Sequence, residues 1–209
     1  MLPTTSALSP SAEKILQAAT ELFGAETFSS VSIKDIAQTS GVNSALISYY
    51  YGGKKNLYQA VLTTQANVFL NLIDLVKAKP LSSVEKLYLY IQETAKIQLS
   101  CPKQVQLIYR ELLMPSGFCD NYVQARLYKI HKFLLELVSD GITTGTITSH
   151  VKPTYVAFTL ESIIVFFFLT QDFARALGSA DNGGEEAYLR EALDTYLASI
   201  TLKEVLPHA

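Results

Sequence analysis

The sequence predicts an all-α protein with a small N-terminal head and a larger helical body, about nine helices in total. Three observations carry this prediction. Apolar residues recur at helical spacing through most of the 209 residues, Ser, Asn and Pro stand where helices would begin, and no alternation of apolar and polar residues is long enough for a strand. We place the domain boundary at residue 56, which gives a head of residues 1–56 and a body of residues 57–209.

The head is expected to contain three short helices, of which the first begins at Pro10 and the other two form a helix-turn-helix. Ser32 and Asp35 have the spacing of a capping box, which starts the second helix at the next residue. Gly41 can adopt the left-handed conformation that ends this helix and reverses the chain. Asn43 is then a suitable N-cap for a third helix over residues 44–51. Two capped helices around one glycine predict a DNA-reading motif.

The third helix has two contrasting faces at 100° per residue. Leu46, Ile47, Tyr50 and Tyr51 share the arc that packs, and Ser44, Ala45, Ser48 and Tyr49 share the arc that faces outward. The outward arc suits a DNA major groove, because hydroxyls bond base edges or phosphates and a methyl group approaches thymine without conflict. Lys54 and Lys55 follow at the start of the next helix, where free backbone amides also favour a phosphate.

The order of these residues follows a known pattern, which runs from a Ser or Thr cap to a cluster of aromatics and a lysine. It is represented here by Ser32, Asp35-Ile36-Ala37, Gly41-Val42, Tyr49-Tyr50-Tyr51 and Lys54-Lys55-Asn56-Leu57. In these residues the chain resembles the TetR/AcrR family of bacterial transcriptional regulators. The resemblance implies a cytoplasmic, ligand-responsive repressor that binds palindromic operator DNA as a homodimer. Together with the cap at Asn43, the residues expected at the DNA are Ser32, Lys34, Asn43, Ser44, Ala45, Ser48, Tyr49, Tyr50 and Lys54.

The charge of the head departs from what the family resemblance leads one to expect. No arginine precedes Arg110, and the four lysines of residues 1–56 are balanced by three glutamates and one aspartate. Ser48 and Tyr51 also replace a tyrosine and a phenylalanine that are frequent in the family. Because phosphate contacts supply most non-specific affinity, we expect weak binding to random DNA and a dependence on dimerisation.

The body is expected to contain six further helices, separated by prolines, glycines and a second capping box at Ser82 and Glu85. They are predicted over residues 54–79, 82–102, 103–114, 120–141, 154–177 and 185–201. Pro80, Pro102 and Pro115 are expected to end three of them, and Gly141 with Gly145 to end a fourth.

The helix over residues 154–177 is apolar almost all the way round, which predicts that a partner chain covers part of it. Phe166, Phe167 and Phe168 are adjacent, so at 100° steps they cannot all face one core. The family resemblance implies that the last two helices pair with their symmetry mates in a four-helix interface, for which the candidate residues are Ile164, Phe167, Leu193 and Leu197. The alternative is that the three phenylalanines fill a monomer core.

Tyrosines are frequent in the middle helices, and some of them can line a pocket for a small apolar or aromatic effector, since a tyrosine offers an apolar face and a hydroxyl together. The candidate lining is Tyr109, Phe118, Tyr122, Arg126 and Phe133, with core packing as the alternative for each. Arg110 and Glu111 form either a structural ion pair or a ligand clamp. The run Tyr109-Arg110-Glu111-Leu112 followed by Pro115 is similar to the C-terminal domain of the CerR-type subgroup.

Composition excludes several classes of protein. A net charge of −2 excludes a protein that coats nucleic acid by bulk charge, and the longest apolar run is far shorter than a membrane helix. Residues 1–8 lack the pattern of a signal peptide. Two isolated cysteines and three scattered histidines predict no metal site, and we expect no cofactor and no catalysis. Two alternatives stay open: a helical ligand carrier or enzyme with a degenerate head, and a helix-turn-helix regulator with another dimer geometry.

Overall fold

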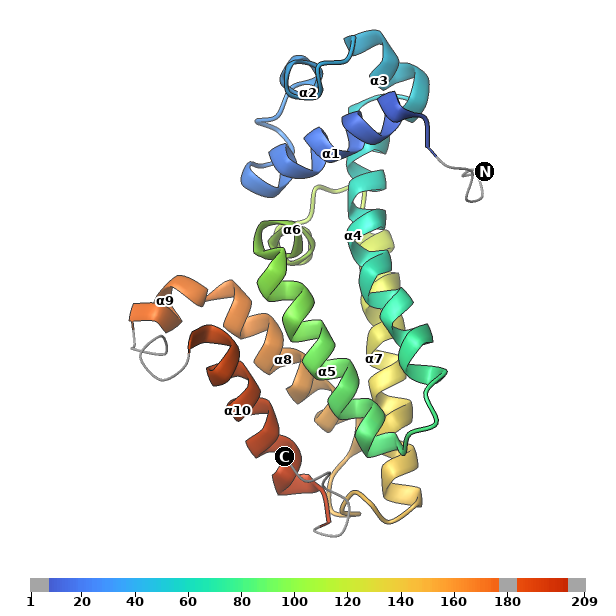
Figure 1. The fold of residues 1–209 in the computed structure, drawn as a ribbon, viewed down its shortest axis with the longest axis vertical. Helices are drawn as coiled ribbons and strands as arrows, with labels where there is room; N and C mark the ends of the chain where they lie inside the picture. Colours follow the sequence, from blue (N-terminus) through green and yellow to red (C-terminus); the bar gives the residue numbers. More distant parts are fainter. Residues whose placement is uncertain (1–7, 177–183, 203–209) are drawn as a thin grey trace. The chain divides into compact units, whose positions relative to one another are not determined.

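The computed structural model describes residues 8–176 and 184–202, except for the side chains of residues 103–104, 120–122, 174–176 and 184–186. The described residues form ten helices and no strand, which confirms the all-α prediction (Figure 1). The helices are α1 (Pro10–Ala25), α2 (Ile33–Ser40), α3 (Ser44–Tyr51), α4 (Lys54–Lys77), α5 (Ser83–Ser100), α6 (Pro102–Leu113), α7 (Asp120–Thr143), α8 (Pro153–Leu169), α9 (Gln171–Ala176) and α10 (Gly184–Ile200).

The chain divides into two compact units, and each unit is built from two separate stretches of sequence. The first unit comprises Met1–Ala66 and Lys103–Val123, so it holds α1, α2, α3, the first half of α4 and nearly all of α6. The second unit comprises Asn67–Pro102 and Gln124–Ala209. From the sequence we assigned the helix over residues 103–114 to a continuous body that begins at residue 57. The division into two units instead groups α6 with the three-helix head.

The first unit is organised around α1, which contacts both α2 and α3, while α2 and α3 contact each other. Its core is formed by fully buried side chains from each of these elements, namely Ile15, Phe23, Ile36, Ile47 and Leu57. The apolar positions of each helix recur at helical spacing, so one stripe of each faces this core. The packing leaves the opposite face of α3 open.

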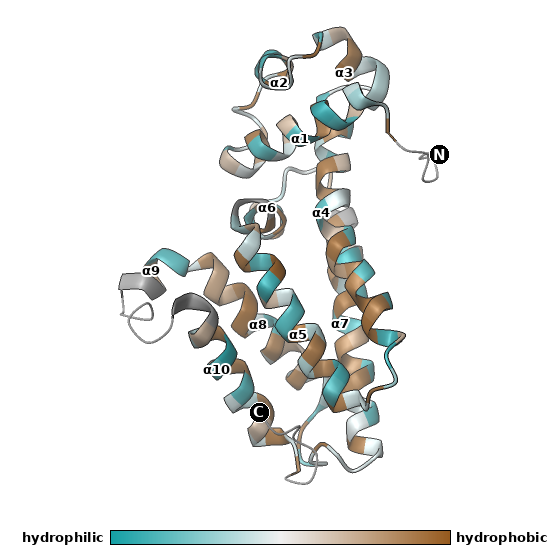
Figure 2. Cartoon of the chain, viewed as in Figure 1, coloured by the Kyte–Doolittle hydropathy of each residue, from teal (hydrophilic) through white to brown (hydrophobic). Residues whose placement is uncertain are grey.

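The second unit is a bundle in which α10 packs against α5 and α8. Its core includes Leu87, Ile91, Val138, Leu160 and Leu197, each of which is less than 2% exposed. Figure 2 shows that α8 is apolar along most of its length, as its sequence predicted. A short backbone pairing closes the end of α10, where the amide of Thr148 donates to the carbonyl of Ile200 at 2.9 Å.

Two predicted helix ends were wrong, and the end of α5 just before Pro102 was confirmed. Gly141 lies inside α7, and a Cβ at this position would lie 2.7 Å from Cδ1 of Ile147, so the glycine permits close packing of the following loop. Gly145, with φ of 74°, makes the turn instead. Pro102 begins α6 as its first residue, where a missing amide hydrogen costs nothing. The helix predicted over residues 154–177 stops at Thr170, and α9 follows; residue 177 lies outside the described residues.

Candidate nucleic-acid interface

The segment from α2 to α3 has the hydrogen bonds of a helix-turn-helix. The amide of Ser32 donates to Oδ2 of Asp35 at 2.8 Å, and the amide of Asp35 donates to Oγ of Ser32 at 3.1 Å. Gly41 ends α2 with φ of 65°. The amide of Ala45 donates to Oδ1 of Asn43 at 2.9 Å, which caps α3. The capping box, the glycine turn and the second cap confirm the predictions from the sequence.

The outward face of α3 is open to solvent. Tyr49 is 78% exposed, and the neighbouring side chains Ser44, Ala45 and Ser48 are exposed as well. On the opposite face Ile47 is fully buried. Tyr51 anchors the end of the helix, because its hydroxyl donates to the carbonyl of Ala12 on α1 at 2.8 Å. Burial raises the pKa of Tyr51 to about 12, so this donor keeps its proton at neutral pH.

Tyr50 lies between the two faces. It was predicted both to pack and to contact DNA, and the structure leaves it 37% exposed with its ring edge-on to Tyr49, the two centroids 5.0 Å apart. The paired rings form a rigid apolar edge beside the hydroxyls of Ser44 and Ser48. Such an edge can contact thymine methyl groups or sugar carbons, whereas the hydroxyls can bond base edges or phosphates.

Two lysines lie at the first turn of α4. Nζ of Lys54 lies 4.2 Å from the centroid of the Phe28 ring, and Nζ of Lys55 lies 5.4 Å from that of Phe118. Both distances are within the range of a cation–π interaction. Burial lowers the pKa of Lys54, and the negative charge of Asp35 opposes this effect. The third predicted basic contact, Lys34, is exposed on α2.

Four rings form an aromatic cluster beneath these lysines, which consists of Phe23, Phe28, Tyr58 and Phe118. The Phe28 ring lies 4.7 Å from the Phe118 ring and 5.1 Å from the Tyr58 ring, both edge-on, and Tyr58 lies 4.9 Å from Phe23. Edge-to-face pairs at these separations are favourable. Phe118 was predicted to line an effector pocket, but the structure gives its ring neighbours in the head.

Arg110 and Glu111 at the end of α6 bind different partners in the first unit. Arg110 donates from Nη2 to the carbonyl of Phe23, near the end of α1. Glu111 is 2% exposed, and its carboxylate accepts from the Tyr58 hydroxyl at 2.8 Å and from the amide and hydroxyl of Ser116 at 3.0 and 2.6 Å. Burial, followed by this hydrogen bond, raises the pKa of Tyr58. Both residues therefore have structural partners, which the sequence left open.

This geometry coincides with a known sequence pattern, since residues 15–61 match the family described as "Bacterial regulatory proteins, tetR family". The matched range covers the end of α1, both helices of the helix-turn-helix and the first turns of α4. Residues 15–61 of the chain therefore match the N-terminal segment of the TetR family of bacterial regulators.

Known proteins with similar sequence or fold are regulators. "Probable HTH-type transcriptional regulator YttP" of Bacillus subtilis (strain 168) is 25% identical over 128 residues, which span 60% of this chain and 61% of that protein. AibR, solved with isovaleryl coenzyme A and operator DNA, has a TM-score of 0.72 at 19% identity and covers 91% of this chain and 98% of its own. FadR of Bacillus subtilis, solved with stearoyl-CoA, has a TM-score of 0.70 at 16% identity and covers 90% and 98%. The two solved structures share the all-α fold of this chain.

The four residues predicted at the dimer interface are buried within the chain itself. Ile164, Phe167, Leu193 and Leu197 are each 6% exposed or less, because they face the core of the second unit. Little of their surface is left for a partner, and their role at an interface stays a prediction. Aromatic side chains that are exposed on α8, α9 and α10 include Tyr155, Phe158, Phe166, Phe173 and Tyr188, between 51% and 67% exposed. Of the Phe166–Phe168 triplet, only Phe166 points outward, as the 100° steps required.

The five predicted effector residues are divided between the two units of the chain. Tyr109 and Phe118 belong to the first, where Tyr109 is buried at 6% exposure. The side chain of Tyr122 lies outside the described ones. Arg126 and Phe133 belong to the second, where the Phe133 ring packs edge-on against Tyr90, with centroids 5.1 Å apart. Packing therefore accounts for Phe118 and Phe133, and an effector role for any of the five stays a prediction.

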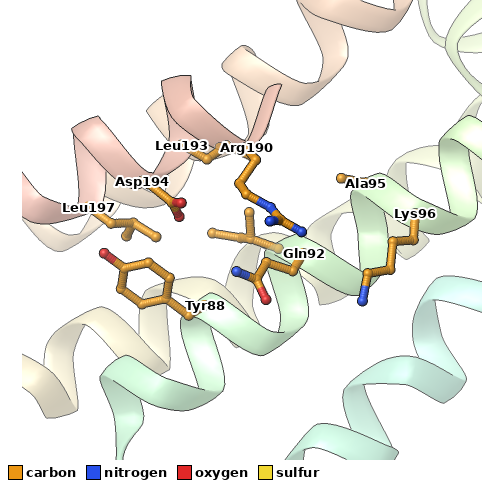
Figure 3. Close-up of a pocket in the computed structure, with 9 residues that line it drawn as sticks. Tyr88, Gln92, Ala95, Lys96, Arg190, Leu193, Asp194 and Leu197 are labelled. Carbon is orange, nitrogen blue, oxygen red and sulfur yellow. The ribbon is translucent and has the colours of Figure 1, made fainter. Parts of the chain in front are cut away.

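A small pocket lies between α5 and α10 in the second unit. Arg190 and Asp194 on α10 project toward Tyr88 and Gln92 on α5 (Figure 3). Burial raises the pKa of Asp194, and the charge of Arg190 opposes the rise. The free volume is about 20 Å³, room for roughly one water molecule. In this structure the pocket is too small for an organic effector.

Two further features bear on excluded functions. His131 on α7 has a structural partner, because its Nδ1 lies 2.9 Å from Oε2 of Glu161 on α8, and burial raises the pKa of that carboxyl. Among the described residues, no group of three or more His, Cys, Asp or Glu is arranged to hold a metal ion. None of the helices, as far as they are described, is both long and apolar enough to cross a membrane.

Proposed function

We propose that this chain is a DNA-binding transcriptional regulator that reads its operator with α3 and responds to a small ligand. The observation that carries the proposal is the open face of α3, on which Ser44, Ala45, Ser48 and Tyr49 project from a helix that is capped at Asn43 and anchored by Tyr51. A solvated helix face would more often carry glutamate or lysine. Hydroxyls, a methyl group and one ring suit base edges in the major groove.

The operator is a palindrome, and the regulator binds it as a homodimer. The head of residues 1–56 is formally neutral, so a single head gains little from phosphate charge. A dimer places two recognition helices about one helical turn of DNA apart, ~34–36 Å, and adds the second half-site. The exposed aromatics of α8 and α9, Tyr155, Phe158, Phe166 and Phe173, are the surface for this association, because a row of half-exposed or fully exposed rings is unusual on a monomer.

The effector is a mostly apolar molecule bound by the second unit, and its binding releases the operator, which makes the chain a repressor. An aromatic ring or an acyl chain both fit this description. AibR and FadR, which share the fold, were solved with acyl-CoA molecules, and this supports an acyl chain as the first class to test. A coupling of ~1–3 kcal/mol between the two sites would change operator affinity by roughly 5- to 150-fold.

The test is fluorescence anisotropy with duplex fragments from upstream of the chain's own gene. We expect one fragment to bind well above the random-duplex background, and Tyr49→Ala to lose this preference while Tyr128→Ala, an equally exposed tyrosine on α7, keeps it. A panel of acyl-CoA molecules and aromatic acids is then titrated into the complex. Specific binding that no compound weakens contradicts the effector part. Ligand binding without DNA binding favours a helical carrier or enzyme with a degenerate head.

A further inference from the structure

The two lysines at the start of α4 belong to one continuous array of charges and rings. Lys54 lies over the Phe28 ring, the Phe28 ring contacts the Phe118 ring, and Lys55 lies over the Phe118 ring. The array is assembled from three separate pieces of sequence. Phe28 follows α1, the lysines begin α4, and Phe118 follows α6, more than sixty residues after the lysines.

An exposed lysine is a poorly defined phosphate ligand, because its flexible four-carbon chain loses rotamer entropy on binding. A ring beneath the ammonium restricts the chain before DNA arrives, so less entropy remains to be lost. Lys54 is half-buried, whereas Lys55 is exposed, so Lys55 depends more on its ring. That ring, Phe118, lies outside the range that defines the family's DNA-binding segment, residues 15–61.

We propose that Phe118 is a positioning residue for DNA binding: it holds the ammonium of Lys55, and through Phe28 that of Lys54, where each can bind a phosphate. This inference rests on the proposed function, and it extends the DNA-binding unit to a segment that the sequence assigned to the body. Phe118 touches no DNA itself. Its effect on affinity passes through the two lysines.

The position of Phe118 is itself fixed by buried polar contacts. The chain between α6 and Phe118 is tied by Glu111, whose carboxylate accepts two hydrogen bonds from Ser116, two residues before Phe118. The same carboxylate accepts from Tyr58 on α4, whose ring contacts both Phe28 and Phe118. Since Glu111 is nearly fully buried, these bonds are not exchanged freely with water. These contacts hold the Phe118 ring in place, which its role as a positioning residue requires.

The experiment compares Phe118→Leu, Phe118→Tyr, Lys55→Ala and the double variant Lys55→Ala/Phe118→Leu, with Leu113→Ala as the matched control because it is exposed on the same segment. Affinity for a random duplex is measured by anisotropy across a salt series, and each variant is melted by circular dichroism. We expect Lys55→Ala to reduce the salt slope by about one unit. Phe118→Leu should weaken binding about 2- to 5-fold and reduce the slope in part. Phe118→Tyr should restore both, and Leu113→Ala should change neither.

The double variant decides between positioning and simple stability. If Phe118 acts mainly through Lys55, the double variant binds only slightly more weakly than Lys55→Ala alone, because only the indirect effect through Phe28 on Lys54 remains. If the losses of affinity caused by Lys55→Ala and Phe118→Leu multiply in the double variant, the inference is overturned. It is also overturned if Phe118→Leu lowers the melting temperature and leaves the salt slope unchanged. Neither result contradicts DNA binding by the chain. A parent protein that binds no duplex overturns the proposed function as well.

A second measurement needs no variant. The ε-methylene protons of Lys55 in the parent protein should show an upfield ring-current shift in their NMR resonances, because Nζ lies 5.4 Å from the centroid of the Phe118 ring. Resonances at random-coil positions overturn the inference even if Phe118→Leu does not fold.

Discussion

Replacing Phe166 with glutamate should separate the dimer without unfolding the chain. Phe166 is 67% exposed near the end of α8, so the substitution places a carboxylate in solvent when the chain is a monomer. In a dimer formed through the exposed aromatics of α8 and α9, the same carboxylate is buried beside a partner's rings. The neighbouring Phe167 is 4% exposed, so Phe167→Glu should instead disrupt the core of the second unit.

The magnitude follows from the exposed area of the ring. An aromatic residue buries about 200 Å² when covered completely, so two thirds of that is ~130 Å². At ~25 cal/mol per Å² this amounts to ~3 kcal/mol per protomer, and a two-fold interface contains the residue twice. If half of the area is covered in the dimer, the loss is still ~3 kcal/mol in total, or roughly a 100-fold increase in the dimer dissociation constant. Unpaired carboxylates in the interface add to this loss.

The assay is sedimentation equilibrium from nanomolar to micromolar concentration, followed by operator binding on the same samples. Tyr128→Glu is the control, since Tyr128 is 68% exposed on α7 and lies off the proposed surface. We expect Phe166→Glu to be monomeric at concentrations at which the parent is dimeric, with an unchanged circular dichroism spectrum and a large loss of operator affinity. A Phe166→Glu protein that dimerises like the parent refutes the reasoning.

Four further predictions concern the first unit. Lys54→Ala should weaken binding to all sequences and reduce the salt slope by about one unit, whereas Tyr49→Ala should cost ~1–3 kcal/mol and alter sequence preference in a competition assay. Ser32→Ala should raise the pKa of Asp35, measured by NMR titration, because hydrogen bonds from the Ser32 side chain and backbone lower it. Since the folded pKa is depressed, this contribution to stability is present above the ordinary aspartate pKa, about 3.9, and is lost as the pH falls through the folded value. The variant should lose the part of this acid dependence that comes from the Ser32 side chain and keep the part that comes from its backbone amide. Glu111→Ala should lower the free energy of unfolding by about 2–5 kcal/mol in a urea titration, because it leaves buried donors without an acceptor, and Glu111→Gln should cost less.

Local sequence signals predicted the elements of the head accurately. Capping by Ser32 and Asn43 and the left-handed turn at Gly41 depend on residues within three or four positions of each other, so no knowledge of the fold is needed to read them. The same holds for the alternation of faces on α3. Helical periodicity also showed that the Phe166–Phe168 triplet must divide between core and surface.

Periodicity did not show which phenylalanine of the triplet faces outward, and this depends on where neighbouring helices lie. Phe167 was chosen for the interface although α10 covers it, with the Tyr188 ring stacked 5.7 Å away. The contacts of Arg110 and Glu111 could not be predicted from the sequence for a similar reason. Their partners Phe23 and Tyr58 are 87 and 53 residues away, a separation that no local pattern encodes. The sequence offers one signal for these contacts, because Phe28 and Phe118 are single aromatic residues in short segments between helices. Such residues indicate that the segments pack against the rest of the unit.

The position of these long-range contacts bears on how an effector signal can reach the DNA. Two helices, α4 and α7, continue without a break from one unit into the other, crossing at Ala66 and Val123. In the first unit Lys55, at the start of α4, lies over the ring of Phe118, two residues before α7 begins. In the second unit the same two helices meet again, where Lys77 lies 3.7 Å from Glu136 and over the Phe133 ring.

Both α4 and α7 include residues of each unit, and in the first unit Lys55 lies in the first turn of α4 while Phe118 precedes α7. Neither helix contains a proline within its bounds, and the interior glycine of α7, Gly141, lies beyond Phe133. If the proposed effector acts through these two helices, we expect its binding to change the spacing of Lys55 and Phe118. If Phe118 positions the phosphate contacts of Lys55 and Lys54, a shift of this kind weakens operator binding without altering α3 itself. Under this mechanism an effector lowers the affinity for random DNA and for operator DNA by similar factors. A mechanism that only separates the two heads of a dimer lowers the affinity for operator DNA alone. The ratio of operator affinity to random-DNA affinity, measured in the presence of ligand, distinguishes the two mechanisms.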